Sequence, residues 1–188
     1  MSDKVVVAAK SPSECTEPEL MAFAELVRSG GEVANKGLLN RIKAAQRLIF
    51  LRQGECLAGV AALKRPRADY RTSIFDKAHA SQTSGPFASE LGWVFVVPNC
   101  RGKRFSHVLT GLAVATATGE CIFATSRTDN YAMHTALHTI GFDRHGTDFP
   151  SRRGLHCLAL FLRQKESKVN KDFLTRKLSE RANGLEPC

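Results

Sequence analysis

Hydrophobic and polar residues follow two patterns along this chain, one typical of helices and one typical of strands. Apolar side chains at 20, 23, 24 and 27 have the i, i+3, i+4, i+7 spacing that predicts an amphipathic helix over 17–28. Similar spacing predicts helices over 33–45, 101–118 and 130–140. Short apolar runs predict strands over 4–9, 47–52, 56–63, 90–97, 121–125 and 155–162, with one more beginning at Phe142.

The predicted order is strand, two helices, three strands, helix, strand, helix and two strands. Helices alternate with strands in the second half, which indicates an α/β or α+β fold with helices packed on a central sheet. The 188 residues have the length of a single domain. We expect this domain to span 1–163 and a basic tail to span 164–188, where Val169, Phe173, Leu174 and Leu178 could form a helical stripe that docks on the domain or mediates a homodimer.

Residues 64–87 interrupt this pattern. Pro66, Gly85 and Pro86, together with scattered charges, predict a long loop with a short helix near 74–80. Long loops within a compact domain are often functional. We therefore expect this segment to shape a substrate site.

Composition narrows the class of protein. With 27 Lys+Arg against 18 Asp+Glu, the formal charge is +9, which favours anionic partners. No apolar run reaches the roughly 18 residues of a membrane span, and the run at 5–9 is too short for a signal-peptide core. We expect a cytoplasmic protein without a membrane partner.

The six cysteines do not have the spacing of a zinc site, so no metal is expected. Cys56, Cys121 and Cys157 lie in apolar runs, where a free thiol behaves as a small core residue. Cys100 has no base reserved for it and is expected to be a loop thiol rather than a nucleophile.

One junction carries most of the chemical information. The predicted strand ending at Pro98 passes through a short turn into a helix whose first turn holds Arg101, Lys103 and Arg104. A helix N-terminus has unpaired N–H groups and about half a positive charge, so it binds anions. The junction is suited to a pyrophosphate.

This segment resembles the coenzyme-A loop of the GNAT acyltransferase superfamily. The family motif, Arg/Gln-x-x-Gly-x-Gly/Ala after a Val-x-Pro strand end, stands here as Arg101-Gly102-Lys103-Arg104-Phe105-Ser106. A second family landmark, an Asn that opens a short helix closed by Gly-Phe, stands here as Asn130 to Gly141-Phe142. The likeness extends over about 4–163 by element order and is tight over 90–142.

The resemblance implies a mixed, mostly antiparallel sheet of six to seven strands flanked by about four helices. The sheet would be splayed between its fourth and fifth strands to hold acetyl-CoA as a co-substrate. The pantetheine would pair with the backbone of Val94, Phe95 and Val96, and Asn130 would contact the bound cofactor. The pyrophosphate would lie on the amides of Arg101, Gly102, Lys103, Arg104, Phe105, Ser106 and His107. Such enzymes transfer the acyl group directly to a primary amine.

Two residues of the loop depart from the family motif. Arg104 stands where the family has Gly, and Ser106 stands where it has Gly or Ala. A Cβ at Arg104 is tolerated if its dihedral angles stay in the right-handed region, and its guanidinium could reach a phosphate.

The catalytic groups also depart from the family pattern. The position of the usual acid, a Tyr, is Leu137 here, and His134 and His138 lie close enough on the helix to replace it, with Tyr131 as a third candidate. Both histidines could instead be surface residues. Glu90, at the start of its strand, is the candidate base, or an exposed strand-end glutamate. Orientation alone can also supply much of the rate.

The acceptor is less constrained by the sequence. Ser126, Arg127 and Thr128 follow a buried strand and are expected to line an acceptor site. The acceptor would be a small-molecule or macromolecular amine, and the basic surface makes an RNA-borne amine reasonable. The alternative is a catalytically silent binding module for nucleic acid, against which the scarcity of aromatic residues in the basic segments argues.

Overall fold

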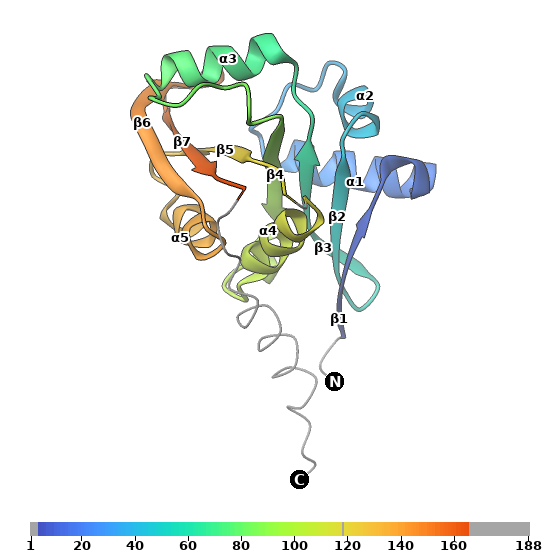
Figure 1. The fold of residues 1–188 in the computed structure, drawn as a ribbon. Helices are drawn as coiled ribbons and strands as arrows, with labels where there is room; N and C mark the ends of the chain where they lie inside the picture. The colour runs from blue at the N-terminus through green and yellow to red at the C-terminus, as the bar shows by residue number, and fades with distance from the viewer. Residues whose placement is uncertain (1–3, 118, 166–188) are drawn as a thin grey trace.

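A seven-stranded sheet forms the centre of the computed structural model, which describes residues 4–117 and 119–165 (Figure 1). The strand order is β1-β2-β3-β4-β5-β7-β6, and every neighbouring pair is antiparallel except β4 and β5. The predicted mixed, mostly antiparallel sheet is confirmed. The strands are β1 (Val5–Lys10), β2 (Arg47–Gln53), β3 (Cys56–Lys64), β4 (Ser89–Val96), β5 (Ile122–Arg127), β6 (Asp143–Pro150) and β7 (Cys157–Arg163).

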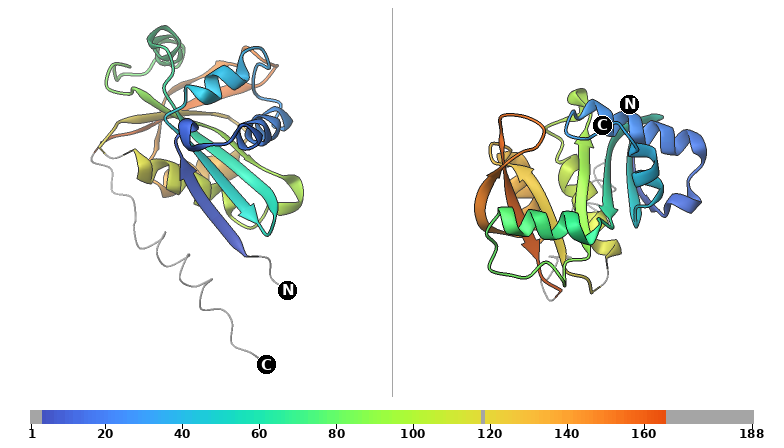
Figure 2. Two further views of the ribbon diagram at one scale, coloured as in Figure 1. Left: turned by 90° about the vertical axis from the view of Figure 1, so that its right-hand side faces the viewer. Right: turned by 90° about the horizontal axis from the view of Figure 1, so that it is seen from above.

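In the part of the chain that the structure describes, five α-helices cover the two faces of the sheet. They are α1 (Glu17–Ser29), α2 (Leu38–Lys43), α3 (Ala68–Lys77), α4 (Phe105–Thr116) and α5 (Tyr131–Thr139), with short 3-10 turns at Pro12–Glu14 and Pro98–Cys100. Alternate strand residues pack against α4 and α5 on one face, and against α1, α2 and α3 on the other. Figure 1 shows α4 in front of the sheet and α1 behind it, and Figure 2 shows α3 set apart from α1 and α2.

The first helix forms as its sequence pattern predicts. Thr16 caps it by accepting a hydrogen bond from the Glu19 amide, and the Glu19 carboxylate accepts one from the Thr16 amide. Its four buried residues are those of the predicted apolar face, Leu20, Phe23, Ala24 and Val27.

Three helix predictions were wrong in their bounds. The helix expected over 101–118 is Phe105–Thr116, so Arg101, Lys103 and Arg104 lie before it or at its cap rather than in its first turn. The helix expected over 33–45 is only Leu38–Lys43, because Gly37 in front of it has a left-handed backbone with φ 68°. The helix expected near 74–80 is α3, which starts at Ala68 and so converts much of the expected loop into helix. Its first turns are polar, and only Ile74 and Phe75 are buried, so apolar spacing revealed only its last part.

The prediction for the cysteines was wrong for Cys56 and Cys157, which are exposed. They are the first residues of β3 and β7, so each lies at the rim of the sheet before the core begins. Cys121, directly before β5, is half-buried and packs against the core cluster under α3, and Cys100 is buried.

Within residues 4–117 and 119–165, no helix is long and apolar enough to cross a membrane. The apolar stripe expected in the tail, Val169, Phe173, Leu174 and Leu178, lies outside the described residues, and so does any dimer made through it.

Candidate functional site

The fourth and fifth strands run side by side for only three residues each. Ser89, Glu90 and Leu91 pair with Ile122, Phe123 and Ala124, and β4 then continues through Val96 without further pairing to β5. A bulge accompanies the separation, because Ala62 pairs with Gly92 and Val60 with Phe95. The bulged residue Trp93 has φ 52°. Bulges bend a strand and strengthen its twist, so this one turns β4 away from β5. The predicted splay is confirmed.

Among the described residues, the second half of β4 therefore has one edge without a neighbouring strand. Val94 and Val96 pack toward the core beneath α4, while Phe95 packs toward the cluster beneath α1. The carbonyl of Val96 accepts a hydrogen bond of 3.2 Å from Nε of Arg101. An edge with unpaired backbone groups can add an extended ligand as it would a strand.

The loop after this edge leads into α4. Within the described part of the chain, the amides of residues 102–106 donate no hydrogen bond, and Phe105 is the first residue of α4. Residues 101–104 are all exposed. The guanidinium of Arg101 lies 5.9 Å from the Phe95 ring centroid, and Lys103 Nζ donates to Gln53 Oε1 over 3.0 Å. Five free amides at a helix N-terminus, flanked by two held cations, offer the donors and the positive charge that a polyanion requires.

Arg104 does not have the right-handed backbone on which an unstrained Cβ at this position depends. Its φ is 59° and its ψ is 25°, the left-handed conformation, and the residue caps α4. The turn into α4 needs this conformation, which a side chain with Cβ adopts at a cost of about 1 kcal/mol or more. The family's glycine at this position would meet no such cost.

Replacing Arg104 separates its backbone role from its charge. We expect Arg104→Gly to relieve the left-handed strain and raise the free energy of unfolding by up to about 1 kcal/mol, while acetyl-CoA binds more weakly for lack of a cation. Arg104→Ala removes the same charge but keeps the strain. It should lose the same affinity without gaining stability. Chemical denaturation and ligand titration measure both effects, and equal stabilities of the Gly and Ala variants would contradict the strain.

The remaining residues of the first turn of α4 lie deeper. Ser106 is half-buried, and its carbonyl accepts a 2.8 Å hydrogen bond from the Thr110 hydroxyl. Burial, with a smaller contribution from Arg104, lowers the pKa of His107. The imidazole is therefore neutral at pH 7, and the positive charge of this loop comes from Arg101, Lys103 and Arg104.

The predicted acid candidates lie on α5. Asn130 caps this helix, its Oδ1 accepting from the Met133 amide over 3.1 Å. His134 Nε2 lies 2.9 Å from the carbonyl of Arg127, and a carbonyl only accepts, so Nε2 carries the proton and Nδ1 is the acceptor in the neutral ring. The His134 ring is half-buried and lies 4.9 Å from the Phe161 ring, whereas His138 is exposed.

Leu137 and Tyr131, the other two positions considered for the acid, are not placed to supply it. Leu137, at the position of the family's Tyr, is buried in the core. Tyr131 is 75% exposed. The structure thus leaves His134 as the candidate held in place by a hydrogen bond.

Glu90, the candidate base, is buried rather than exposed at a strand end. It is 4% exposed and forms an ion pair of 2.7 Å with Lys64 Nζ through its Oε1. Lys64 ends β3 directly opposite Glu90, and its Nζ also lies 5.1 Å from the Trp93 ring centroid. The pair stands where β4 leaves β5, on the face covered by α1, α2 and α3.

Lys64 is a site residue that the sequence did not reveal. It stood in a basic stretch with Arg65 and Arg67, and nothing local distinguishes it from them. Gly92 leaves room for the Lys64 side chain to reach Glu90, because a Cβ at position 92 would lie only 2.7 Å from Cε of Lys64. The sequence feature that could have indicated this ion pair is Gly92, a small residue two positions after Glu90 in a strand of mostly bulky residues.

The two sets of catalytic candidates lie on opposite faces of the sheet. Glu90 shares its face with Phe123 and α3, while His134 packs on Phe161 in the core under α4 and α5. The structure does not bring Glu90 and His134 into contact. The separation of β4 and β5 is what connects the faces.

The end of β5 joins two distant loops. Arg127 pairs with Asp129 over 3.0 Å and with Glu32, in the α1–α2 loop, over 3.4 Å. Glu32 also lies 3.5 Å from Nε2 of His156, in the β6–β7 loop. Of the three residues expected to line an acceptor site, Arg127 ties these loops together. Ser126 is buried, and the Thr128 amide bonds to the Cys157 carbonyl.

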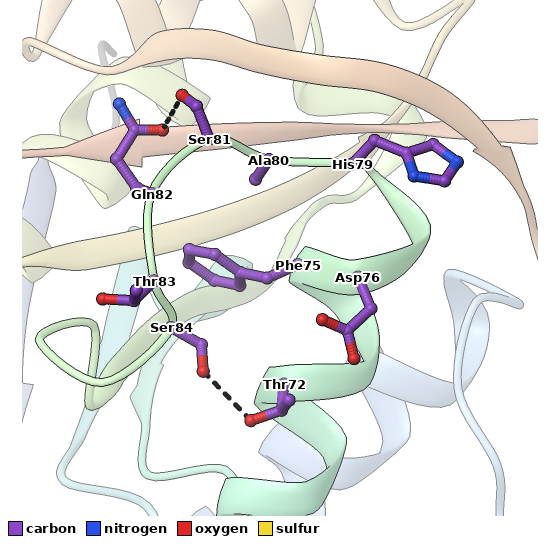
Figure 3. A pocket seen from close by; sticks show the side chains of 9 residues that line it. All are labelled: Thr72, Phe75, Asp76, His79, Ala80, Ser81, Gln82, Thr83 and Ser84. Carbon is purple, nitrogen blue, oxygen red and sulfur yellow. Dashed lines mark hydrogen bonds between the residues drawn. The ribbon is translucent and has the colours of Figure 1, made fainter.

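A separate pocket of about 500 Å³ lies beside α3, lined by Thr72, Phe75, Asp76 and residues 79–84 (Figure 3). Thr72 and Ser84 share a hydrogen bond of 3.0 Å across it. The His79 ring points away from Asp76 and the serines, so these groups form no catalytic relay. The pocket shares no residue with β4 or with the loop that leads into α4.

No family model and no curated protein sequence matches the chain. Solved structures do resemble it. YncA of Salmonella typhimurium, solved with its cofactor acetyl-CoA, is 16% identical with a TM-score of 0.62, over 88% of this chain and 96% of that one. An N-acetyltransferase of Staphylococcus aureus Mu50 is 13% identical with a TM-score of 0.60, over 86% and 98%. FeeM, an N-acyl amino acid synthase from uncultured soil microbes, is 14% identical with a TM-score of 0.60, over 92% and 100%.

At these identities the likeness establishes the fold. It is a splayed mixed sheet, shared with these three solved structures. More particularly, it is the GNAT fold, as the two sequence motifs implied.

Proposed function

We propose that this protein is an acyl-CoA-dependent N-acyltransferase that moves an acetyl group from acetyl-CoA to a primary amine. The observation that carries the proposal is the continuity of the unpaired β4 edge with the five free amides before and within the start of α4. An extended chain ending in a pyrophosphate matches both parts. The acetyl-CoA seen in the structure of YncA supports the choice of this donor.

The residues on either side of the strand separation have distinct tasks in this proposal. Bound acetyl-CoA supplies a thioester, and the acceptor nitrogen attacks its carbonyl carbon as the C–S bond breaks. Lys64 holds Oε1 of Glu90, so Oε2 is the oxygen that accepts a proton from the acceptor amine. The imidazole of His134 orients the end of β5 through the Arg127 carbonyl, and it can deliver a proton toward the departing thiolate through water when it is protonated.

Charge reversal at Arg101 tests the donor site. Acetyl-CoA at a hundred times its dissociation constant should stabilise the wild type by about 2.7 kcal/mol, a shift of several degrees. In Arg101→Glu this shift should disappear, because the substitution removes a cation and places a carboxylate beside the free amides. Thermal melts with and without acetyl-CoA measure the shift.

The control is Arg28→Glu, the same charge reversal at an exposed position at the end of α1. It should keep the full acetyl-CoA shift. An unchanged melting temperature of the wild type with acetyl-CoA would overturn the proposed donor.

A silent acyl-CoA-binding module is the second candidate. Two observations favour it: Leu137 fills the position of the family's acid, and Lys64 occupies one oxygen of Glu90. The same melts, followed by an amine-acceptor screen, separate the two. Binding with transfer identifies an enzyme, and binding without transfer to any amine identifies the module.

A further inference from the structure

Charged side chains gather near Tyr70 and Glu90 on the face opposite α4, and their composition bears on the acceptor. The Glu90 cluster comprises Glu90, its ion-pair partner Lys64, Tyr70, the two arginines whose charges act on Tyr70 together with that of Glu90 (Arg152 and Arg153), and Arg71, the neighbour of Tyr70 on α3. It draws on β3, β4, α3 and the β6–β7 loop. Only one of its members is a carboxylate, against four permanent or nearly permanent cations.

The first helical turns of α3 bring Tyr70 and Arg71 toward the sheet. They precede the buried Ile74 and Phe75 by four residues each, which places them on the same side of the helix. Phe75 lies 5.7 Å from the ring of Phe123, and Phe123 is the β5 partner of Glu90. The sheet-facing side of α3 therefore reaches the place where β4 and β5 part.

The electrostatic environment of Tyr70 shows which charges lie near the place where β4 and β5 separate. Tyr70 is 42% exposed. Burial around the hydroxyl, and next the charge of Glu90, raise the pKa of Tyr70, while Arg153 and Arg152 act in the opposite direction. The two loop arginines and Glu90 thus act on the same hydroxyl from different elements. Tyr70 stays protonated and can donate a hydrogen bond.

The arginines of this cluster lack anionic partners. Arg67, Arg127 and Arg144 each form an ion pair with a carboxylate. Across residues 4–117 and 119–165, Arg71, Arg152 and Arg153 form none, and Nε of Arg71 is buried without a hydrogen-bond partner. A buried guanidinium N–H without an acceptor is unfavourable unless a ligand supplies one.

The β6–β7 loop holds its arginines in a defined place. The Ser151 amide donates to the His156 carbonyl over 3.0 Å, and the Arg153 amide donates to the Ser151 hydroxyl over 3.1 Å. His156 in turn lies against Glu32 of the α1–α2 loop. Ser151 and His156, on either side of Arg152 and Arg153, are thereby linked to each other and to the α1–α2 loop.

From this arrangement we infer that the acceptor is a small amine that also carries an anionic group, a carboxylate or a phosphate. The ammonium or amine end lies at Oε2 of Glu90, and the anionic end lies at the guanidinium groups of Arg71, Arg152 and Arg153. Polyamines and other cationic acceptors are disfavoured, because four cations face them against one carboxylate. This inference rests on the proposed function and specifies its acceptor.

Matched acceptors test it with acetyl-CoA as donor. Glycine, β-alanine and L-leucine are compared with their amides, phosphoethanolamine with ethanolamine, and spermidine serves as the cationic acceptor. We expect kcat/KM for the anionic member of at least one pair to exceed that of its neutral partner by about tenfold or more. Preference for the acids identifies a carboxylate, and preference for phosphoethanolamine identifies a phosphate. Preference for the amides, ethanolamine or spermidine overturns the inference.

The variant Arg152→Gln/Arg153→Gln, in an exposed loop, locates the recognition. We expect KM for the anionic acceptor to rise about tenfold or more, with KM for its neutral partner and the acetyl-CoA melting shift unchanged. Arg28→Gln/Lys43→Gln removes two cations from the ends of α1 and α2. It should change neither of the two KM values, nor the acetyl-CoA melting shift. An equal loss for both members of a pair overturns the inference.

Binding distinguishes this inference from the proposed function. Where no acceptor is turned over, calorimetric titration of the same pairs into the protein with CoA replaces the rate. Binding of the anionic member alone, lost in Arg152→Gln/Arg153→Gln, supports the inference although transfer fails. Equal binding of both members, or none, overturns it. The proposed donor stands or falls separately on the acetyl-CoA melting shift.

Discussion

Lys64→Met should lower the free energy of unfolding by about 3–5 kcal/mol, because it removes the one ion-pair partner that the described residues give the buried carboxylate of Glu90. Lys64 and Glu90 expose 18% and 5% of their side chains, so water cannot replace the lost ammonium. Methionine keeps the apolar stem that lies over Gly92. Denaturant unfolding at pH 7 measures the loss.

The double variant Lys64→Met/Glu90→Gln is the matched control. Replacing both members of a buried pair with uncharged residues of similar volume is often neutral or stabilising, so most of the lost stability should return. Glu90→Gln alone should cost less than Lys64→Met, since the Lys64 ammonium can still reach water. A loss below about 1 kcal/mol in Lys64→Met would show that the pair behaves like an exposed one.

These variants should rank differently in kcat for acyl transfer than in their free energy of unfolding. Glu90→Gln removes the proposed proton acceptor while keeping the fold, and it should reduce kcat by about a hundredfold or more. The acetyl-CoA melting shift should remain, since Glu90 lies on the opposite face from the loop into α4. Retention of full activity would show that orientation alone drives the reaction.

Gly146→Ala should destabilise the fold by about 3 kcal/mol or more. Gly146 lies in β6 with φ 68°, and a Cβ there would stand 1.9 Å from the carbonyl oxygen of Ala78 at the end of α3. That same carbonyl accepts a 2.7 Å hydrogen bond from the Thr147 amide, so it cannot move away without breaking the contact between α3 and β6. Thermal or chemical unfolding measures the change.

Gly31→Ala is the control for the backbone conformation. Gly31 has φ 74°, close to that of Gly146, but a Cβ there meets no atom within 4 Å. It should lose only the cost of a left-handed alanine, about 1 kcal/mol. The difference between the two variants is the steric cost of pressing α3 off β6. Equal losses would mean that α3 yields freely.

Each wrong prediction has its own reason in the sequence pattern. Periodicity located α1 and α5 well, and α4 except for its start, because each buries an apolar face that recurs every three or four residues. It placed α3 too late because the first turns of α3 present Tyr70 and Arg71 to a charged cluster instead of a core. It buried Cys56 and Cys157 because an apolar run does not show where a strand leaves the sheet. The dihedral angles of Arg104 were missed because the side chain at the family's glycine position obscured the turn's need for positive φ.

The sequence by itself determined the order of most elements and the candidate loop for the pyrophosphate, and its two motifs carried the resemblance that implied the GNAT fold. These depend on residues a few positions apart: apolar spacing, caps, and cations next to a helix N-terminus. Only the tertiary structure decided that Lys64 faces Glu90, that Arg127 and His156 meet Glu32, and that Ala78 touches Gly146. Each of these contacts joins segments far apart in the chain. Strand register and the bulge at Trp93 create them, and no local pattern encodes which distant charge a register will place opposite.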